Sequence, residues 1–149
     1  MISFRVPAVP IAQPRQRHRM VSTGGKFYAH NYTPTKHPVN EFKATVKLAF
    51  VAAYHGPPLE GALGFKLAFV MPRTKQMTWK TKPMPRVHRC GGHGGDWDNI
   101  SKAVCDALNG LAFKDDKQIA SAHVDLYVAG GDEQPHVEVE IWRLENDDA

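Results

Sequence analysis

Two acidic pairs and one lysine have the residue types and spacing needed for metal-assisted chemistry. Asp96 and Asp98 are separated by one residue, so in an extended segment their carboxylates point the same way. Lys102 follows Asp98 by one helical turn, and Asp115 and Asp116 form a second acidic pair. Carboxylates packed together raise one another's pKa unless a cation compensates their charge. The pattern therefore favours a site for Mg²⁺, a hard ion that takes oxygen ligands.

A Mg²⁺ site beside a basic surface is typical of phosphodiester hydrolysis. The bound ion lowers the pKa of a water molecule and neutralises charge on the departing oxygen. Lys102 would stabilise negative charge on the phosphate or help to orient the attacking water. The same residues also suit a helix cap at Asp98, an i+4 salt bridge and a polar turn, so the Asp-x-Asp pair alone is a weak signal. The second acidic pair and the charge distribution strengthen the catalytic interpretation.

The charge of the chain is divided unevenly. Residues 1–95 carry 15 Lys and Arg against two Glu, whereas residues 96–149 carry four Lys and Arg against 13 Asp and Glu. This asymmetry predicts a polyanionic partner, with nucleic acid as the first candidate. Phe27, Tyr28 and Trp79 lie among the basic residues and suit base stacking, although solvated loops have a similar composition. The side chains expected to contact DNA are Arg15, Arg17, Arg19, Lys75, Lys80, Lys82, Arg86 and Arg89.

Length and composition indicate one domain over residues 1–149. The chain is 42% apolar and 23% charged, which is ordinary for a globular protein. No apolar run approaches the roughly 18 residues that span a bilayer, and the N-terminus has no long apolar core of a signal peptide. Two cysteines, Cys90 and Cys105, fit a reducing compartment. We therefore expect a cytoplasmic protein without membrane association.

Apolar periodicity predicts the elements that position the site. The first half is expected to contain a strand over 2–6, a basic flap over 10–37 with a hairpin around Gly24-Gly25, a helix over 39–55 and a strand over 63–71. A basic loop over 73–95 and a helix over 98–110 follow. The chain then forms a final hairpin of strands 120–128 and 137–141 and ends in a frayed tail over 145–149. The second helix separates an apolar face from a polar face that carries Asp98, Lys102, Cys105 and Asn109. This order predicts an α/β (α+β) sandwich, a mixed sheet with two principal helices on one face.

The stretches from Asp96 to Gly110 and from Phe113 to Ile119 resemble the signature of the RusA family of Holliday-junction resolvases, the crossover junction endodeoxyribonucleases. The resemblance extends loosely over 2–142. It implies a RusA-like fold and a Mg²⁺-dependent homodimer, usually of phage or prophage origin, that resolves four-way DNA junctions by paired symmetric nicks. Mn²⁺ would substitute for Mg²⁺, and no nucleotide cofactor is expected. By position, the family's metal-binding catalytic aspartates correspond to Asp96, Asp98 and Asp116. Its essential lysine corresponds to Lys102, and Asp115 corresponds to a supporting acid. Asn99 and Asp106 also match the family, and for these two residues we expect capping or supporting roles.

Two other interpretations compete with a nuclease. A non-catalytic basic module could bind branched or single-stranded DNA, and it would keep its affinity without Mg²⁺ or the aspartates. A zinc site of His88, Cys90, His93 and Cys105 fits poorly, because tetrahedral sites generally use paired ligands at tighter spacing. His123 alternates outward on its strand and is expected to be a surface residue rather than a general base.

Overall fold

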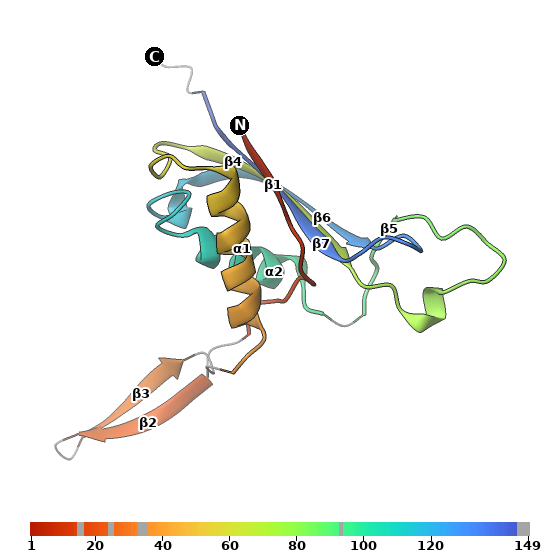
Figure 1. Cartoon of the computed structure of the whole chain (residues 1–149). Coiled ribbons are helices and arrows are strands. Elements are labelled where there is room, and N and C mark those ends of the chain that lie inside the picture. The colour runs from red at the N-terminus through yellow and green to blue at the C-terminus, as the bar shows by residue number, and fades with distance from the viewer. Residues whose placement is uncertain (15–16, 24–25, 33–35, 93, 146–149) are drawn as a thin grey trace.

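In the computed structural model of the chain, a five-stranded mixed sheet carries two helices on one face (Figure 1). The structure describes residues 1–14, 17–23, 26–32, 36–92 and 94–145, and for 17–23 and 26–32 it describes the backbone. The mixed sheet and its two helices confirm the predicted fold class. In the described parts of the chain, no helix is long and apolar enough to cross a membrane.

The sheet contains β1 (Ile2–Val6), β4 (Leu63–Met71), β5 (Val87–His88), β6 (Ile119–Val128) and β7 (His136–Arg143) in the spatial order β1-β7-β4-β6-β5. β4 pairs with β6 in parallel and with β7 antiparallel. Eight of the nine residues of β4 are buried, which suits the central strand. β1 pairs antiparallel with β7 at one edge, and the two residues of β5 pair with β6 at the other.

The expected final hairpin is wrong, because β4 lies between β6 and β7. Both strands exist close to their predicted bounds, and the Gly130-Gly131 segment does connect them. Alternation of apolar residues shows which face of a strand is buried, but it does not identify the neighbouring strands. Inserting β4 between the other two strands buries a strand that is apolar on both faces except at the exposed Lys66.

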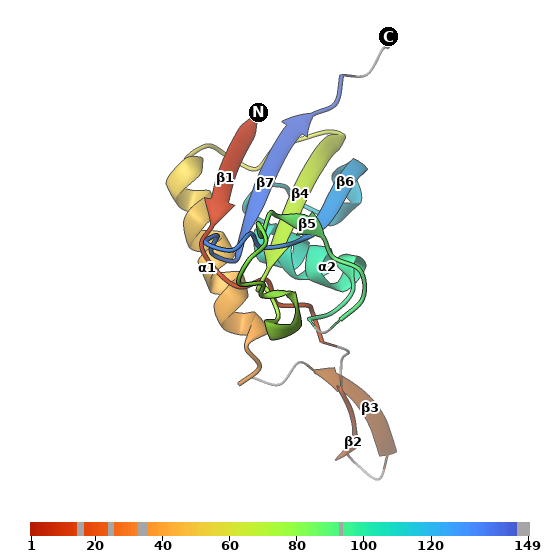
Figure 2. The ribbon, with the colours of Figure 1, turned by 90° about the vertical axis from the view of Figure 1, so that its right-hand side faces the viewer.

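Helices α1 (Val39–Ala53) and α2 (Trp97–Leu108) cover the same face of the sheet (Figure 2). Most residues of the predicted apolar stripes are buried: Val39, Phe42, Val46 and Phe50 in α1, and Ile100, Val104, Ala107 and Leu108 in α2. Ala103 of α2 is buried in addition. These residues pack on Phe65, Leu67 and Phe69 of β4. α2 begins one residue before the predicted start, and Gly110 follows its end with φ +85°, a conformation that glycine adopts freely.

The predicted hairpin in the basic flap is confirmed at the level of the backbone. β2 (Arg17–Thr23) and β3 (Lys26–Tyr32) pair antiparallel. Figure 1 shows this pair extending away from the sheet and its helices. Gly24 and Gly25, at the expected turn, lie outside the described residues, as does the expected tail beyond residue 145.

The basic loop over 73–95 contains more structure than its composition indicates. It includes a 3₁₀ turn over Lys75–Met77 and the short strand β5. Arg73 donates hydrogen bonds to the backbone oxygens of Met77 at 2.6 Å, Pro85 at 3.1 Å and Ala129 at 3.1 Å. A partly buried guanidinium thus provides the internal contacts that this loop cannot obtain from apolar side chains.

Candidate active site

The start of α2 presents the first acidic pair to solvent. Asp96 is the residue before the helix, and its side chain accepts no capping hydrogen bond. Asp98 lies in the first turn, and Lys102 is placed one turn later on the same polar face. All three residues are exposed. The predicted alignment of Asp98 with Lys102 is confirmed, whereas the N-cap position belongs to Asp96 rather than to Asp98.

Three contacts position the chain just before α2. Arg89 donates to the backbone oxygens of Gly91 at 2.9 Å and Gly95 at 2.8 Å. A Cβ atom at Gly95 would lie 2.3 Å from the Cβ of Ala12, and φ there is +90°. Only glycine fits this close approach. Gly95, directly before Asp96, therefore permits Ala12, near the beginning of the flap segment, to pack against the chain just before the helix start.

The second acidic pair lies on a 3₁₀ turn over Asp116–Gln118. Asp115 caps this turn by accepting a hydrogen bond from the backbone N–H of Lys117 at 2.9 Å. That bond is the main cause that lowers the pKa of Asp115, and a side-chain hydrogen bond with Asp116 acts in the same direction. Gln118 completes the capping box. Its spacing from Asp115 is the signal from which this role could have been predicted.

The thiol of Cys105, on the polar face of α2, is affected by charges from two parts of the chain. Burial raises the pKa of the Cys105 thiol to about 12, and the charges of Asp116 and Asp106 add to the effect. The charge of Lys102 acts in the opposite direction. Asp116 and Lys102 therefore both act electrostatically on this thiol, although 14 positions separate them in the sequence.

Lys43 is a basic neighbour of the site that the sequence analysis missed. It lies on α1, and its ammonium is 3.8 Å from Oδ2 of Asp106 on α2. Burial lowers the pKa of Lys43, Asp106 opposes this shift, and Lys47 and Lys102 add to it. The ion pair of Lys43 and Asp106 connects α1 and α2. No local sequence pattern reveals how these two helices are placed relative to each other.

The three expected metal ligands, Asp96, Asp98 and Asp116, come from two separate parts of the chain. Within the described residues, no group of three or more His, Cys, Asp or Glu side chains is arranged to hold a metal ion. The convergence of Asp96, Asp98 and Asp116 therefore stays a prediction. The donor set itself suits Mg²⁺, because all three side chains and Asp115 are exposed carboxylates, and hard oxygen ligands are those Mg²⁺ prefers.

Two of the expected DNA contacts are engaged within the protein. Arg86 pairs with Glu133 and Glu138, and Arg89 holds the glycine-rich segment before α2. Lys75, Lys80 and Lys82 are exposed. Arg15 lies outside the described residues, as do the side chains of Arg17 and Arg19.

Trp79 is an exposed ring flanked by cations. The guanidinium of Arg73 lies 5.0 Å from its ring centre, and the ammonium of Lys82 lies 5.7 Å away. The exposed fraction of Trp79 is 38%. This arrangement orders the ring while leaving part of it open for stacking. The side chains of Phe27 and Tyr28 are outside the described part.

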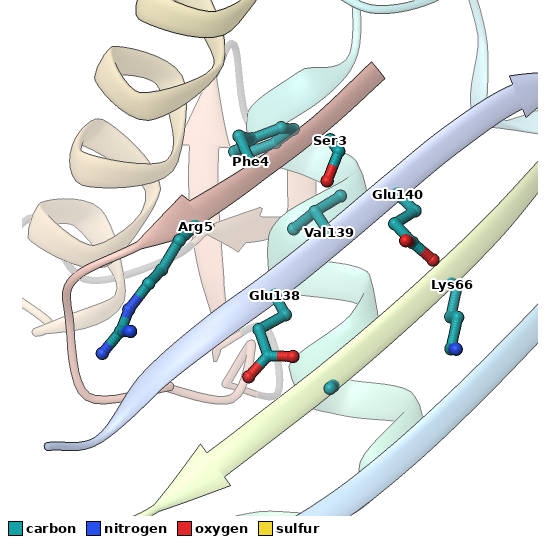
Figure 3. A pocket seen from close by; sticks show the side chains of 8 residues that line it. Ser3, Phe4, Arg5, Lys66, Glu138, Val139 and Glu140 are labelled. Carbon is teal, nitrogen blue, oxygen red and sulfur yellow. The ribbon is translucent and has the colours of Figure 1, made fainter. Parts of the chain in front are cut away.

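A hollow of about 330 Å³ on the sheet is separate from the acidic pairs. It lies over β1, β7 and β4, and Figure 3 shows Arg5, Lys66, Glu138 and Glu140 around it. These strands present their apolar side chains to the helices on the other face. Since it contains none of the expected metal ligands, we do not assign the chemistry to this hollow.

Two histidines on the sheet face without helices, His88 and His123, share the carboxylate of Asp125. Nε2 of His88 lies 3.2 Å from Oδ1 of Asp125, and Nε2 of His123 lies 3.0 Å from Oδ2. His123 is exposed, as expected for a surface residue. His93 lies outside the described residues, and Cys90 is exposed. The described part of the chain therefore gives the zinc interpretation no support.

The sheet with two helices on one face, together with carboxylates and a lysine at an exposed helix start, defines a single-domain α+β protein equipped for phosphodiester chemistry. Residues 7–142 match the family described as Endodeoxyribonuclease RusA, so the chain belongs to the RusA endodeoxyribonuclease family. A relative in Bacillus subtilis (strain 168), the uncharacterized protein YqaN, is 30% identical over 145 residues, 94% of each chain. The resemblance found in the sequence is thereby confirmed, and the family implies endonuclease activity on Holliday junctions, which are branched DNA.

Proposed function

We propose that this protein is a Mg²⁺-dependent endodeoxyribonuclease that resolves four-way DNA junctions by paired symmetric nicks. The observation that carries the proposal is the polar face of α2. Asp96 and Asp98 lie at its exposed start, Lys102 lies one turn further on, and the charge of Asp116 acts on Cys105 of the same helix. Family membership over residues 7–142 supports the reaction class.

Each side chain has a defined role in this proposal. Asp96, Asp98 and Asp116 would hold Mg²⁺, with Asp115 as a supporting acid, and Mn²⁺ would substitute. Such a cation, when bound, makes a water molecule more acidic and neutralises charge on the leaving oxygen. Lys102 stabilises negative charge on the phosphate or orients the water, because its ammonium lies on the same helix face.

Basic residues would guide the DNA to this face. The proposed contacts are the exposed Lys75, Lys80 and Lys82 of the basic loop and the arginines of the flap, Arg15, Arg17 and Arg19. Neutralising phosphates releases condensed counterions, which drives binding regardless of sequence. We assign Arg86 and Arg89 mainly to holding the basic loop, because both are occupied by contacts within the protein.

Cutting both strands of a symmetric junction requires two sites. A homodimer supplies them, since a two-fold axis relates the arms of the junction and the two protomers. The same proposal includes action in the cytoplasm of a bacterial or phage-infected cell during DNA recombination or repair. Support for both points comes from the family resemblance.

The test uses the purified full chain with a labelled immobile four-way junction and its linear duplex. Paired nicks in the junction that require added Mg²⁺ are the expected result. Tight junction binding with no cleavage in Mg²⁺ or Mn²⁺ would instead support a non-catalytic DNA-binding module. Equal cleavage of the linear duplex would contradict selectivity for junctions.

A further inference from the structure

The carboxamide of Gln118 joins two segments that are distant in the sequence. Its Oε1 accepts hydrogen bonds from the backbone N–H groups of Lys114 at 2.9 Å and Asp115 at 3.2 Å. Its Nε2 donates to the backbone oxygens of Leu59 at 2.9 Å and Gly61 at 3.0 Å. One side chain thus connects the turn that carries the second acidic pair to the segment before β4.

Only an amide can satisfy all four of these partners. The oxygen of Gln118 faces two donors, and its nitrogen faces two acceptors. Glutamate would place an ionised oxygen against the carbonyls of Leu59 and Gly61, and lysine would offer no acceptor to the turn. Replacement of Gln118 by glutamate therefore breaks the two hydrogen bonds that Nε2 donates. The side chain keeps nearly the same shape and volume.

Few other contacts hold this turn. Residues 114–117 are all exposed, so no buried apolar side chain anchors them. The neighbouring ion pair between Lys114 and Glu60 spans 3.4 Å, and both side chains are more than 70% exposed, so it contributes little. Just before the turn, Phe113 is fully buried and the N–H of Leu59 bonds to the oxygen of Ala112 at 2.8 Å. The core thus contacts the chain at Phe113 and again at the partly buried Ile119, and within the turn between them the contacts are polar.

We infer that Gln118 is a positioning residue that fixes the 3₁₀ turn carrying Asp116 against the segment before β4, and so sets where the Asp116 carboxylate lies for the proposed reaction. Asp116 is the first residue of the 3₁₀ turn, and Gln118 is the last. Anchoring Gln118 to residues 59 and 61 limits where the Asp116 carboxylate can lie. The inference rests on the proposed function in its effect on catalysis, but its structural part can be tested without DNA or metal.

The first experiment measures amide hydrogen exchange in the metal-free protein. In Gln118→Ala, the amides of Lys114 and Asp115 should exchange at least tenfold faster than in the unmodified protein, because both lose their acceptor. The amide of Leu59 should be unchanged, since it bonds to Ala112. Unchanged exchange at Lys114 and Asp115 would overturn the inference, whether or not the protein cleaves DNA.

The second experiment measures cleavage of a four-way junction and its binding in the absence of metal. Gln118→Glu and Gln118→Ala should lower kcat by about 10- to 100-fold and raise the Mg²⁺ concentration for half-maximal activity, with junction Kd within twofold. The matched control is Gln134→Ala, because that glutamine is exposed and its contact with His136 is made through the backbone. It should leave all three quantities unchanged.

Two outcomes separate the inference from its rivals. A normal kcat in both Gln118 variants, with active unmodified protein, would overturn the positioning role and leave the proposed function intact. A kcat that falls only in proportion to the unfolded fraction, measured by thermal melting, would also overturn it. If the unmodified protein cuts no junction, the proposed function fails, and the exchange experiment still decides the positioning of the turn.

Discussion

Nη2 of Arg86 lies 3.0 Å from Oε2 of Glu138, so the basic loop is tied to β7. The same guanidinium also pairs with Glu133 in the turn that precedes this strand. Arg86 therefore has its charge compensated within the protein. The sequence suggested Arg86 as a DNA contact. In the structure, Arg86 instead holds the basic loop in place.

Arg86→Ala should destabilise the protein in a pH-dependent way. The hydrogen bond from Arg86 lowers the pKa of Glu133 from 4.5 to about 2. A depressed carboxyl pKa stabilises the fold at pH values above 4.5, and this contribution is lost as the pH falls from 4.5 to 2. We expect a loss of about 1 kcal/mol at pH 7, or about 2–4 °C in Tm. In thermal melts, the Tm difference between Arg86→Ala and the unmodified protein should become smaller below pH 4.5. A Tm difference that does not change with pH would contradict the pairing of Arg86 with Glu133. Arg143→Ala, in an exposed residue at the end of β7, is the control.

Replacing Lys75, Lys80 and Lys82 together by alanine should weaken junction binding and reduce its salt dependence. Removal of each lysine–phosphate interaction lowers the slope of log K against log salt by about 0.9. Fluorescence anisotropy between low and moderate salt measures this slope. Lys66→Ala, on the sheet face without helices, should leave it unchanged. An unaltered slope in the triple variant would exclude these lysines from the DNA path.

Asp98→Asn should retain junction affinity and lose cleavage by at least about 100-fold, because the amide removes a charged ligand for the cation. Gel-shift binding without metal and single-turnover cleavage with Mg²⁺ separate the two effects. Asp132→Asn, at an exposed turn position away from α2, serves as the control. Cleavage by Asp98→Asn at the unmodified rate would show that this carboxylate is not a ligand.

Cys105 should resist alkylation in the folded protein. Burial and the charge of Asp116 raise its thiol pKa to about 12, so almost none of the reactive thiolate is present at pH 8. In Cys90→Ser, which removes the exposed thiol, iodoacetamide should react at least about 100-fold more slowly than it does after denaturation. Rapid labelling of this folded variant would mean that Cys105 is not enclosed beside Asp116.

Local patterns were sufficient to predict most elements of this fold. The apolar residues at three- and four-residue spacing identified α1 and α2, and alternation identified the long strands. Alternation did not reveal that β4 separates β6 from β7, because strand partners are chosen by the burial of the whole sheet. The two-residue strand β5 was missed, since two residues are too few to show a period.

The sequence alone determined the chemical types at the site and the family, because Asp96, Asp98 and Lys102 lie on one continuous stretch with helical spacing. The tertiary structure decided which distant groups accompany them. It lets the charge of Asp116 act on Cys105, places Lys43 beside Asp106, and pairs Arg86 with two glutamates. Spacing within a helix follows from backbone geometry, whereas contacts between elements depend on how the whole core packs.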